Sequence, residues 1–149
     1  MAQAHNNRPL SPHLSIWRWG PAMAVSILHR AAGEGLAFVG LPVLLWFLAS
    51  LASGPEAYQT FTSWLWPDLS GNTWGSVPEV FVSLLHIALR FVLVGLSWAF
   101  FEHMTSGLRH FVLDLGAGYE LDTNNGWSWA VPAIAIVLTA LFWALILLR

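Results

Sequence analysis

The 149-residue sequence contains no cysteine and no lysine, and only 9% of its residues are charged. Without cysteine, this chain cannot form a disulfide, a thiolate metal site or an iron–sulfur centre. So few charged side chains cannot cover a soluble domain of this size, in which about a quarter of the residues are charged. The sequence therefore excludes an ordinary soluble protein, and any redox cofactor must be held by histidine.

Apolar and aromatic side chains are abundant. Hydrophobic residues make up 56% of the chain, which has ten tryptophans and nine phenylalanines. Integral membrane proteins place such aromatic side chains at both lipid–water boundaries, so we expect a membrane protein. The net charge of −2 and the scattered arginines do not indicate nucleic acid or acidic ligands as partners.

Two uncharged apolar stretches, at residues 35–52 and 127–148, are each long enough to cross hydrocarbon as a helix. A third stretch, at residues 77–101, is interrupted by His86 and Arg90, and its two halves are too short to span separately. The pattern therefore predicts three membrane crossings, one of which carries a charge.

The predicted fold is an all-α membrane protein, a bundle of three transmembrane helices at about residues 22–52, 77–110 and 127–148. They form a single transmembrane domain over residues 1–149, which begins with an N-terminal cytoplasmic segment at residues 1–21. No internal repeat divides the chain.

The connections and one proline add detail to this prediction. Pro42 should bend the first helix, because it cannot donate a backbone hydrogen bond. The segment at residues 53–76 is rich in Ser, Gly, Pro and Trp, which is typical of an aromatic-anchored loop, and residues 115–126 form a short, turn-rich connection.

The arginines indicate how the bundle is oriented. Arg8, Arg18 and Arg30 lie before or at the start of the first helix, the first loop has none, and Arg109 ends the second helix. By the positive-inside rule, we expect a cytoplasmic N-terminus and a C-terminus on the outer side.

His103 and His110 lie where the second helix leaves the membrane, in the stretch "HMTSGLRH". At about 100° and 1.5 Å per residue they differ by about 20° around the helix and about 10.5 Å along it, so they share a face. Gly107, one turn after His103, would let a flat group such as haem lie against the backbone. Spacing alone leaves open the more common case of interfacial histidines hydrogen-bonded to loop carbonyls.

Four other polar residues can each be interpreted in two ways. Arg30 and Arg109 suit propionates or a quinone oxygen, although ordinary positive-inside anchoring is favoured by the residues alone. Arg90 lies about 16 Å into the second helix and must find water, lipid phosphate or a carboxylate. For His86, one turn earlier, a structural role is favoured.

Three segments together resemble a known family. "RPLSPHLSIWRW" at residues 8–19, "SILHRAAGEGL" at 26–36 and "HMTSGLRHFVLDLG" at 103–116 are similar, in this order, to the cytochrome b subunit of succinate dehydrogenase, the larger membrane anchor of complex II. The resemblance runs from Arg8 to about Gly116, and the third helix matches only in kind.

The resemblance implies specific site residues. His103 corresponds to an axial ligand of haem b and therefore of its iron, and the second axial histidine would come from the smaller anchor subunit. Ser26 and Arg30 correspond to residues that line the ubiquinone pocket. His29 and Arg30 are also expected near the haem propionates.

The sequence departs from the family pattern at two positions. Ala32 stands where the family usually has Ser or Thr, which removes a hydroxyl donor from the quinone motif. Trp17 stands where the family usually has Tyr and keeps both an aromatic body and a donor.

The resemblance also implies an assembly. Succinate would be oxidised on a flavoprotein subunit, and electrons would pass through an iron–sulfur subunit to ubiquinone, linking the citric acid cycle to the respiratory chain. This chain and the smaller membrane anchor subunit would form a larger bundle, with no independent activity of this chain.

The first 23 residues suggest a location. They include three prolines and no short apolar core, which does not fit a cleavable signal peptide, and they do not look like an amphipathic transit peptide. We therefore expect a multi-pass protein of a bacterial inner (cytoplasmic) membrane.

Three other functions stay open at this stage. One is a fumarate reductase-type anchor that uses menaquinone. Another is a self-contained b-type cytochrome in which His29 and His103 ligate one haem. The third is a cofactor-free scaffold or small transporter, with Arg90 as a counter-charge for the substrate.

Overall fold

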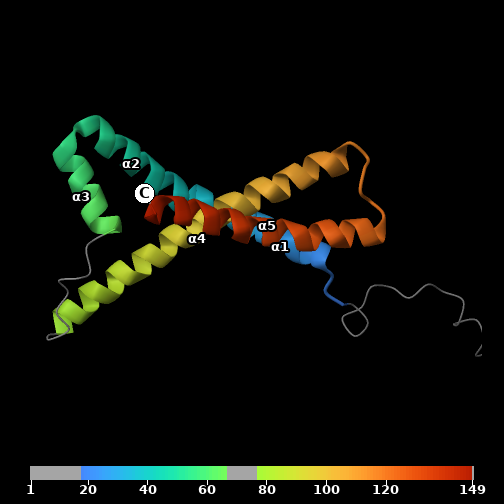
Figure 1. Ribbon diagram of the computed structural model, residues 1–149, viewed down its shortest axis with the longest axis horizontal. Helices are drawn as coiled ribbons and strands as arrows, with labels where there is room; N and C mark the ends of the chain where they lie inside the picture. Colours follow the sequence, from blue (N-terminus) through green and yellow to red (C-terminus); the bar gives the residue numbers. More distant parts are fainter. Residues whose placement is uncertain (1–17, 67–76, 149) are drawn as a thin grey trace, which may run out of the picture.

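The computed structural model describes residues 18–66 and 77–148, and within these ranges the chain is helical with no strand (Figure 1). The elements in order are α1 (Pro21–Gly35), the π-helical turn η1 (Leu36–Gly40), α2 (Leu41–Ser53), α3 (Pro55–Leu65), α4 (Val77–Asp114) and α5 (Leu121–Leu147). The predicted all-α class is confirmed. Trp17, Arg8 and most of the N-terminal segment at 1–21 lie outside the described residues.

Three of the described helices are long and apolar enough to cross a membrane. They are the continuous rod of α1, η1 and α2 over Pro21–Ser53, then α4 over Pro78–Asp114, and α5. Figure 1 shows that α1 begins at the end of the molecule where α4 ends and α5 begins, while α2 and α5 end at the opposite end. The predicted bundle of three crossings is therefore confirmed. Which end faces the cytoplasm stays a prediction.

The first crossing stays helical on both sides of its proline. Pro42 has no N–H to donate to the carbonyl one turn earlier. Directly before it the chain widens into η1, where the N–H of Leu41 donates to the carbonyl of Leu36, five residues back. The disturbance expected at Pro42 thus takes the form of a π-helical turn.

Helix α3 was not expected, because the composition of residues 53–76 is that of a loop. Gly54, with φ of +103°, reverses the chain after α2, and Pro55 then occupies the first helical position, where its missing N–H does no harm. The prediction of an aromatic-anchored loop was therefore wrong for Pro55–Leu65, which is helical. The rest of that loop, residues 67–76, lies outside the described residues.

Two helices extend beyond their apolar stretches. Helix α4 continues to Asp114, and α5 begins at Leu121, ahead of its apolar run. With 38 residues, α4 is about 57 Å long, whereas the hydrocarbon core is about 30 Å thick. Hydropathy marks only the part of a helix inside lipid, so it underestimates helices that project into the interface.

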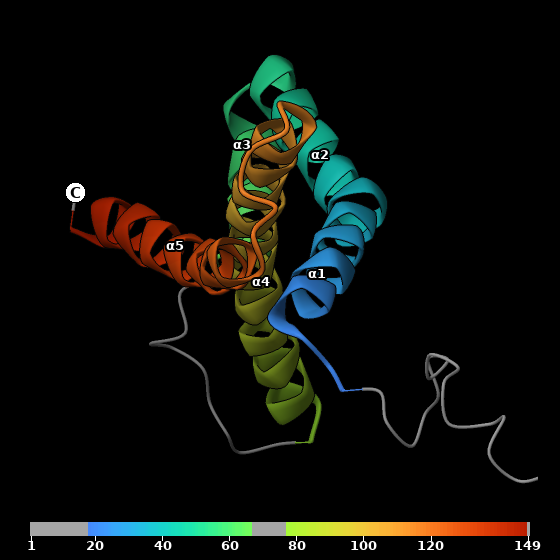
Figure 2. The same ribbon diagram turned by 90° about the vertical axis from the view of Figure 1, so that its right-hand side faces the viewer.

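Helix α4 is the centre of the bundle, with the α1–α2 rod on one side and α5 on the other (Figure 2). The side chains buried between them are mostly small. They include Val25, Ala32, Ser106, Ser128, Val131, Ala135 and Thr139, together with Glu102. Small residues let helix backbones approach closely in lipid, where no hydrophobic force draws helices together.

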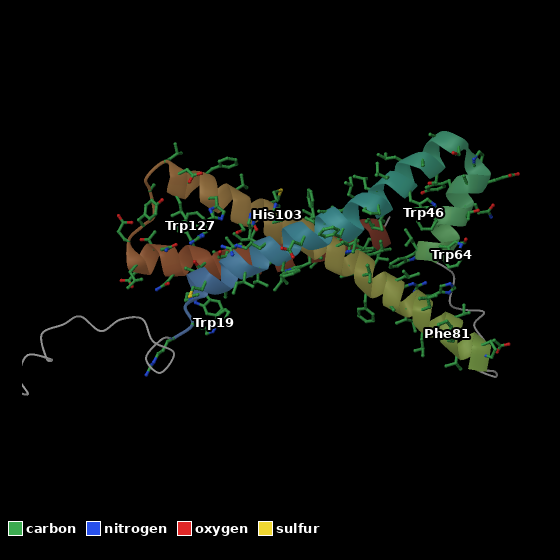
Figure 3. All side chains as sticks on the ribbon, turned by 180° about the vertical axis from the view of Figure 1, so that it is seen from behind. Trp19, Trp46, Trp64, Phe81, His103 and Trp127 are labelled. Carbon is green, nitrogen blue, oxygen red and sulfur yellow. The ribbon has the colours of Figure 1, made fainter. Side chains whose placement is uncertain are left out.

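Large apolar side chains cover the outside of the bundle. Phe38, Phe91 and Leu145 are 81%, 74% and 73% exposed. In Figure 3, Trp19 and Trp127 lie at one end of the molecule, and Trp46 and Trp64 lie at the other. This arrangement of an apolar girdle and two aromatic ends is the one expected of a bilayer-spanning protein.

The half-buried Arg90 of the second crossing has an aromatic partner. The guanidinium carbon of Arg90 lies 4.6 Å from the centroid of the Trp66 ring. Trp66 in turn stacks on Trp143, with ring centroids 5.2 Å apart. This stack joins the end of α3 to α4 and α5, and it gives Arg90 a structural role within this chain.

We predict that Trp66→Leu lowers the free energy of unfolding by about 1–2 kcal/mol, because it removes a cation–π contact and a ring stack. Thermal or denaturant unfolding of the purified protein in detergent measures the change. Trp64→Leu is the matched control at a neighbouring exposed tryptophan and should shift stability by less than about 0.5 kcal/mol. Equal losses in both variants would contradict the role of the stack.

Candidate functional site

Three histidines meet where α1 crosses α4. His29 of α1 lies face to face with His103 of α4, with ring centroids 4.0 Å apart and planes 3° apart. His110, two turns further along α4, lies 5.3 Å from His29 at a tilt of 58°. Both histidines of the "HMTSGLRH" stretch therefore contact the same residue of α1, nearer to the molecular end that carries Trp19 and Trp127 (Figure 3).

A hydrogen bond orients the ring of His103. Its Nδ1 lies 3.0 Å from the backbone carbonyl oxygen of His29. A carbonyl oxygen only accepts, so Nδ1 must carry the proton and donate, which leaves the lone pair of a neutral imidazole on Nε2. Metal-ligating histidines are typically held in this way, by a hydrogen bond from the other ring nitrogen. The acceptor is a carbonyl of helix α1 rather than of a loop.

Gly33 makes this close approach possible. A Cβ atom placed on Gly33 would lie 2.8 Å from Cε1 and 3.1 Å from Nδ1 of His103. Any side chain there would push the imidazole away from α1. The ring of His103 therefore occupies a hollow that only glycine provides.

The sequence pointed to Gly107, rather than to Gly33, as the glycine beside the imidazole. A Cβ atom on Gly107 would meet nothing within 4 Å, so its bare face is open on this chain. The prediction that a flat group lies against Gly107 stays a prediction. Gly33 was missed, although its place one turn after His29, within the family-like segment at residues 26–36, was the available signal.

Ser26 and Arg30 lie one turn apart on α1, beside the histidine crossing. Ser26 is half-buried and Arg30 is exposed, so the guanidinium is accessible to a ligand or a partner chain. Ala32 is 5% exposed and faces the bundle core. It lies about 200° around α1 from Arg30. The hydroxyl that is missing at position 32 would therefore lie on the opposite side of the helix from Arg30.

Arg109 has a role inside the chain. It is buried, and its Nη2 donates to the side-chain oxygen of Asn124 on α5. This bond ties α4 to α5 near the connection between them. Of the two arginines considered as counter-charges for an anionic group, only Arg30 is left exposed.

Among the described residues, no three His, Asp or Glu side chains gather into a set that could hold a bare metal ion. The histidine crossing therefore offers one oriented imidazole rather than a complete ligand set.

Comparison with known proteins gives this geometry a context. Residues 4–142 match the family model of the succinate dehydrogenase/fumarate reductase transmembrane subunit. The chain belongs to this family. The match continues through most of α5, beyond the segments on which the sequence resemblance rested.

Several relatives are similar over nearly the whole chain. The succinate dehydrogenase cytochrome b556 subunit of Rickettsia felis is 30% identical over 141 residues, covering 95% of this chain and 94% of that protein. The corresponding subunit of Paracoccus denitrificans is 32% identical, covering 91% and 88%. The mitochondrial cytochrome b560 subunit of Mus musculus is 34% identical, covering 91% and 68%.

We predict that Gly33→Ala destabilises the protein by about 1–3 kcal/mol, because the new methyl group overpacks against the ring of His103. Gly35→Ala is the control on the same rod, since a Cβ there meets nothing within 4 Å. It should be neutral or stabilising by about 0.5–1 kcal/mol, the usual gain in a helix interior. Thermal unfolding in detergent distinguishes the two, and a harmless Gly33→Ala would contradict the close contact.

Proposed function

We propose that this chain is the cytochrome b membrane-anchor subunit of a succinate dehydrogenase, which holds haem b and forms part of a ubiquinone site. The family and the names of the similar proteins support this assignment. The structural observation that carries it is the oriented imidazole of His103, with Nδ1 bonded to α1 and the lone pair left on Nε2.

Haem suits the residues at the histidine crossing. The porphyrin supplies four iron ligands, so the protein needs to supply only axial ones, and His103 would be one of them through Nε2. The second axial histidine would come from the smaller anchor subunit. His29 and Arg30 would lie near the propionates, where a guanidinium can donate two parallel hydrogen bonds. Bound haem b supplies one-electron transfer.

Ser26 and Arg30 would bind the quinone. The exposed guanidinium and the neighbouring hydroxyl are both donors; Arg30 lies on the side of α1 that faces away from the bundle core, and Ser26 is half-buried one turn before it. A quinone oxygen becomes more negative on reduction, so a charged donor stabilises the reduced form more than the oxidised form. Their role is thus to orient ubiquinone and to favour its reduction.

The partners follow from the proposed assembly. A flavoprotein subunit would oxidise succinate, an iron–sulfur subunit would deliver the electrons, and a smaller anchor would complete the bundle. The broad apolar exterior of α2 and α4 is suited to a second set of membrane helices. We place the complex in a bacterial inner membrane, with the N-terminus on the cytoplasmic side.

The other functions considered are less favoured. Both bacterial relatives described above carry succinate dehydrogenase names rather than fumarate reductase names. Two imidazoles that bind one metal ion would each direct a ring nitrogen at it, whereas the rings of His29 and His103 lie face to face 4.0 Å apart. This stacking argues against a bis-histidine site within this chain. Arg90 is stacked on Trp66, which argues against a transporter counter-charge.

We predict that His103→Ala removes the haem b absorption from the dithionite-reduced complex. Loss of an outer-shell partner alone lowers metal affinity about 10–100-fold, so loss of the ligand itself should empty the site. His86→Ala, on the other half of α4, should retain the absorption. An unchanged reduced spectrum in His103→Ala would refute haem ligation by this residue.

We predict that Arg30→Ala lowers ubiquinone reduction about 10²–10³-fold, while succinate oxidation with a soluble artificial acceptor is retained. Arg30→Lys should reduce ubiquinone at a rate between those of Arg30→Ala and the unchanged protein, since lysine keeps the charge and loses the planar pair of donors. Steady-state assays with both acceptors make the comparison. A parallel loss of both activities would mean that Arg30 serves assembly instead.

A further inference from the structure

An apolar cavity of about 610 Å³ lies between the α1–α2 rod and α4. Beyond the crossing at Gly33 and His103, the two helices diverge toward the end of the molecule that carries Trp46 and Trp64 (Figure 3). The wall of the cavity includes Leu36, Val43 and Phe47 of the rod and Leu96, Ser97 and Phe101 of α4. Its volume is within the range of about 300–1,000 Å³ that is typical of small-molecule sites.

The wall of this cavity has nothing to offer a polar ligand. Among the described residues that line it, only Ser97 has a polar side chain. Its hydroxyl already donates to the backbone carbonyl of Leu93, at 2.9 Å. A polar ligand would lose its hydrogen bonds to water and gain none here. The cavity therefore suits a ligand group that is purely hydrocarbon.

Aromatic rings limit the shape of what can enter. Phe61 of α3 lines the cavity at its outer end and contacts Trp46 and Phe47, with ring centroids 5.0 and 5.5 Å apart. On the side of α5, Phe142 is in edge contact with Phe101, at 6.0 Å. A helix about 10–12 Å in diameter would fill 610 Å³ with only about 5–8 Å of its length. A thin, flexible hydrocarbon chain fits this space better than a transmembrane helix of a partner.

The cavity and Arg30 are on the same side of the bundle. Helix α5 passes in front of the wedge between α2 and α4 in Figure 1, so the cavity is accessible from the opposite side. Arg30 lies about 200° around α1 from Ala32, which faces the core, so it also points away from the core. Leu36, the first lining residue of the rod, is about 9 Å along the helix from Arg30.

We propose that this cavity binds the isoprenoid tail of the ubiquinone whose head is bound by Ser26 and Arg30. The inference rests on the proposed function and adds a subsite for the tail to it. The head needs hydrogen-bond donors, which Arg30 supplies, and the tail needs apolar surroundings, which begin at Leu36. Contacts of the tail with Phe47 and Phe101 would hold the head in position, because many weak dispersion contacts add up along a chain.

Steady-state kinetics of the intact complex in lipid nanodiscs tests the subsite. Two ubiquinone analogues are compared, one with a long isoprenoid tail and one with the same ring and no tail. Val43→Phe and Ser97→Leu each place a larger side chain in the cavity, from opposite walls. Each should lower the ratio of kcat/KM for the long-tailed quinone to kcat/KM for the tail-less one by about tenfold or more, since even one methylene matters in a fitted pocket.

Val92→Phe is the matched control. It enlarges an exposed side chain of α4 that does not line the cavity, and it should leave the ratio unchanged. A ratio that also stays unchanged in Val43→Phe and Ser97→Leu would overturn the tail subsite, as expected if a lipid chain fills the cavity instead. If the proposed function itself were wrong, the complex without any substitution would reduce neither quinone.

Photolabelling gives a second readout, which is independent of activity. A long-tailed ubiquinone with a diazirine in the tail should label residues 36–47 of the rod or 93–101 of α4, as identified by mass spectrometry. Val43→Phe should reduce this labelling. Labelling confined to the outer surface of α5 or to another subunit would overturn the proposal.

Discussion

The close approach of α1 and α4 at Gly33 is the contact on which the rest of the structure depends. With no side chain on Gly33, the ring of His103 reaches the carbonyl of His29, and this one hydrogen bond fixes both the tautomer and the plane of the imidazole. The same approach brings the small core residues of the two helices together. The geometry of the candidate ligand and the packing of the bundle are therefore set by one position.

The membrane explains why such contacts matter. In lipid, exposed apolar side chains such as Phe38 and Phe91 gain nothing by moving inward, so helix association depends on close packing of small residues and on polar contacts. The bundle has polar contacts at both ends: Arg90 on Trp66 at one end, and Arg109 bound to Asn124 at the other. Arg90 and Arg109 consequently have structural roles within this chain.

The sequence predicted the class, the three crossings and the shared face of His103 and His110, because these depend on hydrophobicity and on helical periodicity within one segment. It did not predict α3, whose polar composition resembles that of a loop although Gly54 and Pro55 start a helix. It also emphasised Gly107 instead of Gly33. Spacing defines a face of one helix, but only the arrangement of two helices shows which glycine receives the ring.

Burial separates two kinds of polar residue near the histidine crossing. Glu102, Ser106 and Arg109 are buried in the three-helix core, where groups outside this subunit do not reach them. Arg30 is exposed and Ser26 and His103 are half-buried, so their remaining hydrogen-bonding or ligating atoms are available to groups outside it. A residue set divided in this way is what half of a shared site requires. Arg109 ties α4 to α5 through Asn124, and the outward residues are left for the haem, the quinone and the second anchor under the proposed function.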